Sequence, residues 1–232
     1  MKILSIIPAR SGSKGIKNKN MTKFLGQPLI KHTIEFSKKL PNTTTFVSTD
    51  SIKILRYAQK NNIKFDYLRP KKLSKDNSNI SDAILHALKW FYKKNIIFDY
   101  FLLLQPTSPI RSYAEVIKIL NFSKKKKISS VVSATRMTEH PYECLELNYN
   151  GRWKYLVKNL NKKIYLRQEY KNNYYFIDGS IYFVKVDFFT KNKTLISENS
   201  TKIFRSKIKR QVDINTYEDL KIAELLYKKI FL

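Results

Sequence analysis

Residues 8–20 read PARSGSKGIKNKN and combine four basic side chains with two glycines and two serines. No acidic residue appears before Glu35. Glycine lets backbone N–H groups approach an anion closely, arginine binds two phosphate oxygens at once, and lysine adds a mobile point charge. The stretch therefore predicts a site for a polyanion such as a triphosphate, with a solvated basic turn as the alternative. Its spacing matches neither the Walker loop G-x-x-x-x-G-K-[ST] nor the dinucleotide motif G-x-G-x-x-G.

Other polar groups follow the segments that are expected to be strands. They are Ser48-Thr49-Asp50, Arg69-Pro70 and Gln105-Pro106-Thr107-Ser108-Pro109. Strand-to-helix loops are normally polar, and Thr49 or Asp50 would serve equally well as a helix cap. Asp213, in RQVDINTYEDL, is either a helix-entry residue or a carboxylate ligand for magnesium. Because several of these groups are expected at one edge of a sheet, together with the basic loop they predict a single site.

The elements that must position these residues alternate between strand and helix patterns. Expected strands cover 2–7, 45–50, 63–68, 98–105 and 128–134, and expected helices cover 29–40, 51–61, 80–91 and 113–122. The helix over 80–91 has the clearest apolar stripe, with Ile80, Ile84 and Phe91 on one face. Alternating strands and helices with short connections predict an α/β fold whose mainly parallel sheet is covered on both faces.

The pattern changes after about residue 138. Residues 140–176 contain few apolar runs and many tyrosines and lysines, and we expect extended or hairpin structure there. A strand followed by a turn is expected over 179–189. Thr216 and Asp219 have capping-box spacing, so a final helix should start at Thr216. The simplest organisation is one domain over residues 1–232 with 140–176 as an inserted arm.

The composition limits the classes of function. The chain of 232 residues is 43% hydrophobic and carries a formal charge of +27, which favours anionic partners such as nucleic acid, an anionic membrane or phosphorylated small molecules. We expect most of the lysine to form a solvated surface. Cys144 is the only cysteine, so no internal disulfide can form. The N-terminal apolar run is too short for a signal peptide and no stretch is long enough to cross a bilayer, so we expect a soluble, cytoplasmic protein.

In order, the stretches IIPARSGSKGIKNKN, VSTDS, LRPKKLSKDNS, LLLQPTSPIR, IDGSIY and VDINTYEDL resemble the CMP-sialic acid synthetase family over nearly the whole chain. These cytidylyltransferases activate nine-carbon 2-keto-3-deoxy (nonulosonic) acids. The resemblance implies a Rossmann-like three-layer sandwich of the nucleotide-diphospho-sugar transferase type. It also implies a Mg²⁺-dependent reaction in which CTP and a sugar acid give a CMP-sugar and pyrophosphate. Family members are homodimers, which makes 140–176 the expected dimerisation and sugar-site arm.

The resemblance also implies a role for individual residues. Arg10, Ser13, Lys14 and Lys19 match positions that hold the triphosphate, and Arg10, Lys14, Lys19 and Asp213 are the expected catalytic residues. Asn20 is expected near the nucleotide and Arg69 beside the cytosine. Gln105, Arg167 and Gln168 match sugar-binding positions. Asp213 matches the first carboxylate ligand of Mg²⁺.

Three positions depart from the family pattern. Asn215 replaces the second metal carboxylate, so the ion would be held by one charge fewer. Asp178-Gly179-Ser180 replaces the usual Asn-Gly-Ala and is expected to place a negative charge near the anionic sugar. Ile80 stands where a cytosine-side serine is common, so we expect the base contact to come from Asn79 or Ser81.

Two alternative functions remain open from the sequence. A cytidylyltransferase for the eight-carbon 3-deoxy-manno-octulosonic acid would share the fold and the chemistry. A basic nucleic-acid-binding protein would account for the charge, although no recognition motif accompanies it. No motif distinguishes sialic, legionaminic and pseudaminic acids, and we expect no specific nucleic-acid or membrane partner.

Overall fold

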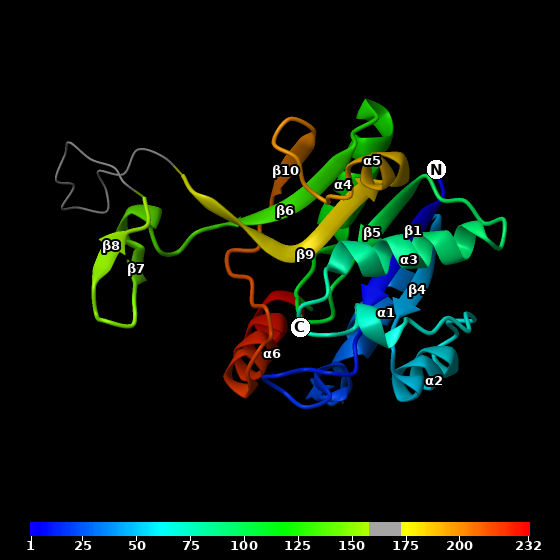
Figure 1. Cartoon of the computed structure of the whole chain (residues 1–232), viewed down its shortest axis with the longest axis horizontal. Coiled ribbons are helices and arrows are strands. Elements are labelled where there is room, and N and C mark those ends of the chain that lie inside the picture. The colour runs from blue at the N-terminus through cyan, green and yellow to red at the C-terminus, as the bar shows by residue number, and fades with distance from the viewer. Residues whose placement is uncertain (158–172) are drawn as a thin grey trace.

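The computed structural model describes residues 1–157 and 173–232. Six strands form the central sheet in the order β10–β6–β9–β5–β1–β4 (Figure 1). Their bounds are β1 Ile3–Pro8, β4 Thr43–Ser48, β5 Tyr100–Leu103, β6 Ser130–Arg136, β9 Tyr175–Lys185 and β10 Thr201–Arg205. Within the described residues, β9 pairs antiparallel with β5 and β6, whereas the β1–β4, β1–β5 and β6–β10 pairs are parallel. The predicted mainly parallel sheet is confirmed.

Successive side chains of a strand point to opposite faces, and here both faces are apolar and covered by helices. Leu4 and Ile6 of β1 pack in one cluster with α3 (Ile80–Tyr92) and α5 (Val186–Asn192). Ile3 and Ile7 face the opposite layer, formed by α1 (Leu29–Lys38) and α4 (Tyr113–Lys126). The two helical layers, with the sheet between them, form the expected three-layer sandwich.

Two further helices complete the body. The helix α2 (Ile52–Lys60) packs through Ile54 against the α1 side of the sheet. The C-terminal helix α6 (Tyr217–Phe231) is closed by the expected capping box of Thr216 and Asp219. It shares a small core with the loop after β1 and with Phe24 of the short strand β2 (Lys23–Phe24), which pairs with β3 (Gln27–Pro28). This packing brings segment 213–216 next to the basic loop.

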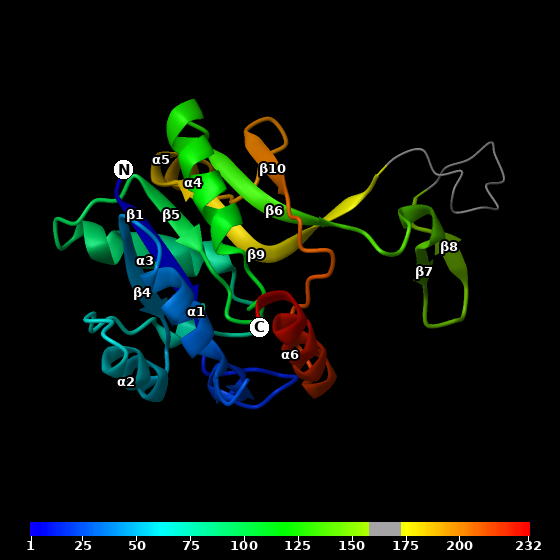
Figure 2. The same ribbon diagram turned by 180° about the vertical axis from the view of Figure 1, so that it is seen from behind.

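A small hairpin of β7 (Leu145–Leu147) and β8 (Trp153–Tyr155) stands apart from the body in both views (Figures 1 and 2). All six of its strand residues are exposed. It lies in the expected arm 140–176, so the prediction of hairpin structure there is confirmed for the described part. Short 3-10 turns cover Lys19–Met21, Lys71–Leu73 and Pro141–Glu143.

Two expectations about the elements were wrong, and one strand was missed. Residues 63–68 form no strand. The side chains of Ile63 and Tyr67 are buried in the core, but the backbone of this segment pairs with no neighbouring strand. The strand expected over 179–189 begins at Tyr175 and ends at Lys185, and α5 replaces the expected turn. The edge strand β10 was missed, since its sequence TKIFR is short and mostly exposed.

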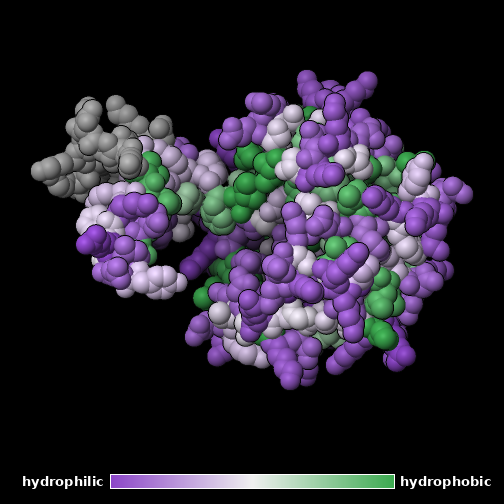
Figure 3. Space-filling view, viewed as in Figure 1, coloured by the Kyte–Doolittle hydropathy of each residue, from purple (hydrophilic) through white to green (hydrophobic). Residues whose placement is uncertain are grey.

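The surface shown in Figure 3 is mostly hydrophilic, in keeping with the expected lysine coat. Within the part of the chain that the structure describes, no helix combines the length and apolar character that a membrane span requires.

Candidate active site

A cavity of about 550 Å³ opens at the carboxyl ends of β1 and β5. Ten of the predicted site residues line it: Arg10, Ser13, Lys14, Lys19, Asn20, Arg69, Asn79, Gln105, Asp213 and Asn215. The other two, Arg167 and Gln168, lie outside the described residues. The predicted convergence of the polar segments at one sheet edge is confirmed.

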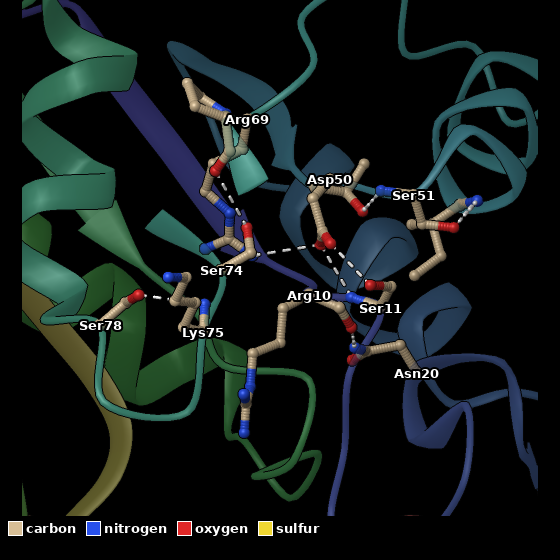
Figure 4. A network of polar contacts seen from close by, with 12 residues as sticks. Arg10, Ser11, Asn20, Asp50, Ser51, Arg69, Ser74, Lys75 and Ser78 are labelled. Carbon is tan, nitrogen blue, oxygen red and sulfur yellow. Dashed lines mark hydrogen bonds and ion pairs between the residues drawn. The ribbon is translucent and has the colours of Figure 1, made fainter. Parts of the chain in front are cut away.

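The basic loop after β1 is held in place by neighbouring side chains. Asp50 accepts hydrogen bonds from the backbone N–H of Ser11 at 2.8 Å and from its hydroxyl at 2.6 Å (Figure 4). Asn20 donates to the carbonyl of Arg10 at 3.1 Å. Neither Asp50 nor Thr49 caps the following helix, because Ser51 does so. The loop therefore has a defined shape instead of behaving as a loose basic turn.

Arg69 is a buried cation on the wall of this cavity, only 4% exposed. Arg69 Nη2 lies 4.0 Å from Asp50 Oδ1. Within the described structure, the Nε and Nη2 atoms of Arg69 are buried without a hydrogen-bond partner. Burial lowers the pKa of Arg69, and the charge of Asp50 opposes that shift. The Nε and Nη2 atoms are covered by the wall, and the charge of Arg69 makes this side of the cavity positive.

Two cations of the basic loop contact an acid from the loop before α3. Arg10 Nη1 donates to Asp76, and Lys14 Nζ lies 3.4 Å from the other carboxylate oxygen. The hydrogen bond from Arg10, aided by Lys14, lowers the pKa of Asp76. The Asp76 carboxylate therefore occupies a position where an anionic ligand would also bind. Sequence analysis missed Asp76, although KDN lies within a motif that it had singled out.

A third cation of the basic loop contacts the segment before α6: Lys19 Nζ donates to the carbonyl of Ile214 at 2.7 Å and to Asn215 Oδ1 at 2.9 Å. Asn215 Nδ2 in turn donates to Asp213 Oδ2 at 3.0 Å. Burial lowers the pKa of Lys19, while the charge of Asp213 raises it. These contacts join the basic loop to the carboxylate expected to hold the metal.

The backbones of the two segments touch at Gly15. A Cβ atom built on Gly15 would lie 2.0 Å from the carbonyl oxygen of Asn215, closer than real Cβ contacts occur. Gly12, on the same loop, has no atom within 4 Å of its equivalent position. Glycine is therefore required at position 15 by close approach, whereas position 12 has open space.

The donor set fits magnesium as this ion is usually bound at nucleotide sites. Mg²⁺ commonly takes one or two carboxylates together with phosphate oxygens and water. Asp213 supplies one such carboxylate in the cavity, and among the described residues no cluster of three or more metal-ligating side chains is present. With its amide nitrogen toward Asp213 and its oxygen toward Lys19, Asn215 supports the carboxylate instead of adding a second one.

Two remaining predictions concern the base and the sugar. Asn79 lines the cavity, and its side-chain oxygen caps α3 by accepting from the N–H of Ser81 at 2.9 Å. Asp178 does not line the cavity: it is 5% exposed, and its carboxylate accepts hydrogen bonds from Ser133 and Thr135. The Asp178 carboxylate therefore points into the protein and does not face the cavity.

The sequence model of the cytidylyltransferase family matches residues 4–232 of this chain. The chain belongs to the cytidylyltransferase family. It is 32% identical to the CMP-N,N'-diacetyllegionaminic acid synthase of Legionella pneumophila, over 97% of this chain and 96% of that protein. It is 29% identical to the pseudaminic acid cytidylyltransferase of Campylobacter jejuni, over 98% of this chain and 97% of that protein.

The fold of this cytidylyltransferase also matches a solved structure. A CMP:2-keto-3-deoxy-manno-octonic acid synthetase in complex with CTP superimposes with a TM-score of 0.71, covering 99% of each chain at 16% identity. At that identity the similarity supports the fold and not the sugar. The expected nucleotidyltransferase architecture is confirmed.

Proposed function

We propose that the protein transfers the cytidylyl group of CTP to a nine-carbon 2-keto-3-deoxy sugar acid and releases pyrophosphate. The observation that carries this proposal is the convergence of four cations, Arg10, Lys14, Lys19 and Arg69, on one cavity. A guanidinium there suits the carbonyl and ring nitrogen of cytosine, and the three other cations suit a triphosphate. The cytidylyltransferase family and the two named relatives support the same reaction.

The chemistry follows from this arrangement. The anomeric hydroxyl of the sugar acid loses its proton to solvent as its oxygen forms a bond to the α-phosphorus, and the bond to the bridging oxygen of pyrophosphate breaks on the opposite side. Catalysis of such a transfer depends on holding the reactants in line and neutralising the charge that develops. Arg10, Lys14 and Lys19 line the cavity and would bind the phosphates, and Asp50 keeps their loop in shape through Ser11.

Magnesium is part of the proposal. Asp213 would hold the ion at the cavity wall, with Asn215 and Lys19 orienting that carboxylate. When bound, Mg²⁺ would neutralise phosphate oxygens and so favour departure of pyrophosphate.

The sugar acid is proposed to belong to the nonulosonic class. The two relatives named for legionaminic and pseudaminic acid match this chain over nearly its full length. Gln105 lines the cavity and is the described residue proposed to contact the sugar. The eight-carbon acid remains the alternative substrate, because the solved synthetase for it has the same fold.

We further propose that the chain acts as a homodimer through its arm. The hairpin exposes apolar side chains, among them Leu147 at 68% and Trp153 at 57%. Large exposed apolar side chains that gather in one place are typical of interaction surfaces. Light scattering coupled to size-exclusion chromatography would give twice the mass of the 27.5 kDa chain if this is correct.

The deciding experiment is a substrate panel. The purified protein with Mg²⁺ is given CTP, UTP, ATP or GTP and one acid from the legionaminic, pseudaminic, sialic or octulosonic series, and pyrophosphate release is measured. We expect turnover with CTP and a nine-carbon acid only. Turnover with the octulosonic acid alone would replace the sugar assignment. No turnover, together with tight binding of DNA or RNA at physiological salt, would favour a nucleic-acid-binding role for the +27 charge.

A further inference from the structure

Arg111 is a buried cation that lies behind the wall of the cavity. It is 4% exposed, and all three of its guanidinium nitrogens donate hydrogen bonds. Nε donates to the carbonyl of Ser180 at 2.8 Å, Nη2 to the carbonyl of Gln105, and Nη1 to the hydroxyl of Thr33 at 3.3 Å. One side chain therefore joins α1, the loop after β5 and the strand β9.

The charge of Arg111 is balanced from inside the protein. Burial lowers the pKa of Arg111 to about 9, and the negative charge of Asp178 opposes that shift, so the guanidinium stays protonated at neutral pH. Asp178 is itself fixed, because it accepts from Thr135 at 2.8 Å and from the N–H and hydroxyl of Ser180 at 3.0 and 2.7 Å. Buried charges persist when they are compensated and hydrogen-bonded in this way.

These contacts converge where β9 departs from regular pairing. Val132 of β6 pairs with Tyr182, but Ala134, two residues further along, pairs with Ile177. The extra residues of β9 form a bulge that contains Asp178, Gly179 and Ser180. Bulges change the direction of side chains and are common beside active sites.

The bulge lies directly against Gln105. A Cβ atom on Gly179 would be 3.9 Å from Gln105 Nε2 and 3.4 Å from Ser108 Oγ, and the φ of Gly179 is +74°. Arg111 binds the carbonyl of Gln105 on one side and that of Ser180 on the other. Arg111 therefore holds the backbone of Gln105 and Gly179 lies against its side chain, although neither residue lines the cavity.

We propose that Arg111, with Asp178 as its buried counter-charge, is a positioning residue that sets Gln105 for the sugar acid and has no direct contact with CTP. This inference rests on the proposed function, because it takes the cavity beside Gln105 to be the sugar side. In this proposal the two sides of the site are held in place by different residues. Asp50 shapes the nucleotide side through Ser11, and the Arg111–Asp178 pair shapes the sugar side.

The test is a double-mutant cycle with both substrates varied. Arg111→Lys keeps the charge but cannot bond three acceptors in a planar fork. We expect it to raise the KM for the sugar acid about tenfold and to leave the KM for CTP within about twofold, as loss of a charged hydrogen bond would do. Gln105→Ala should give the same pattern. Because Arg111 acts through Gln105, the double variant should be no worse than the more impaired single variant.

Controls distinguish this role from a general loss of structure. Arg56→Lys, on the exposed face of α2, should leave both KM values unchanged. Thermal melting checks that each variant is folded. If Arg111→Lys does not fold, Asp178→Asn keeps the shape and removes the counter-charge, and it should raise the KM for the sugar acid alone.

Three results would overturn the inference: additive effects in the cycle, an equal rise of the KM for CTP, or an unchanged KM for the sugar acid. Failure of the proposed function looks different. In that case the wild-type protein itself would turn over no nonulosonic acid.

Discussion

A methyl group added at Gly15 should push the basic loop away from the segment that carries Asp213. The Cβ of Gly15→Ala would start 2.0 Å from the carbonyl oxygen of Asn215, and ordinary contact begins at 3.4 Å, so the backbones must part by about 1.4 Å. The basic loop carries Lys14, and the opposing segment carries Asp213. A misplacement of about 1 Å in an active site costs on the order of 100-fold in rate.

We therefore expect kcat/KM of Gly15→Ala to fall about 100-fold, which corresponds to about 2.7 kcal/mol of transition-state stabilisation. Pyrophosphate release at saturating and limiting CTP gives the two constants, and thermal melting shows whether the fold survives. Gly12→Ala is the matched control, because nothing lies within 4 Å of its added carbon. It should retain activity within about twofold.

The reasoning fails if Gly15→Ala is folded and as active as wild type. It fails equally if Gly12→Ala is as impaired as Gly15→Ala, since loop flexibility and not close approach would then be the cause.

Three further expectations follow from the site and its surroundings. Asp76→Asn should lower the Kd for CTP measured by calorimetry, because the carboxylate that competes for Arg10 and Lys14 is removed; weaker binding would mean that Asp76 assists the nucleotide instead. Asn215→Asp should lower the Mg²⁺ concentration for half-maximal rate, since a second carboxylate is restored; an unshifted titration would place residue 215 away from the ion. Burial lowers the pKa of His32 below its ordinary 6.5, so the unfolded chain takes up the proton first and stability is lost as the pH falls through 6.5. His32→Gln should therefore reduce the drop in Tm between about pH 7.5 and pH 5.5, and an equal drop would contradict that assignment.

The sequence was sufficient to predict where the site lies. In a parallel sheet the carboxyl ends of the strands meet at one edge, so the basic loop after β1 and Gln105 after β5 had to converge. Asp213 could be assigned to the same edge only through the family resemblance. Its place follows from the apolar contact of Ile214 with Ile16 and Leu220, which periodicity alone does not indicate.

Other features depend on three-dimensional contacts that no local pattern contains. The alternation in 63–68 correctly reports burial of Ile63 and Tyr67, but hydrogen bonding to a neighbouring strand is a separate property. Asp178 looked like a charge facing the ligand. Its real surroundings come from Ser133, which is 45 residues away, and from the bulge in β9. The contact between Asp76 and Arg10 likewise spans 66 residues.

The strand β9 leads directly from the arm into the middle of the sheet, where it is flanked by β5 on one side and β6 on the other. Its outer residues Tyr175–Ile177 pair with β6, and the ladder with β5 begins only at Tyr182, so a pull on the outer end is resisted first by the β6 ladder. The hairpin is joined through residues 137–144 to β6, so a force on it from a docked neighbour reaches the ladder that β6 forms with β9. The arm is anchored mechanically in the same strand that shapes the wall beside Gln105.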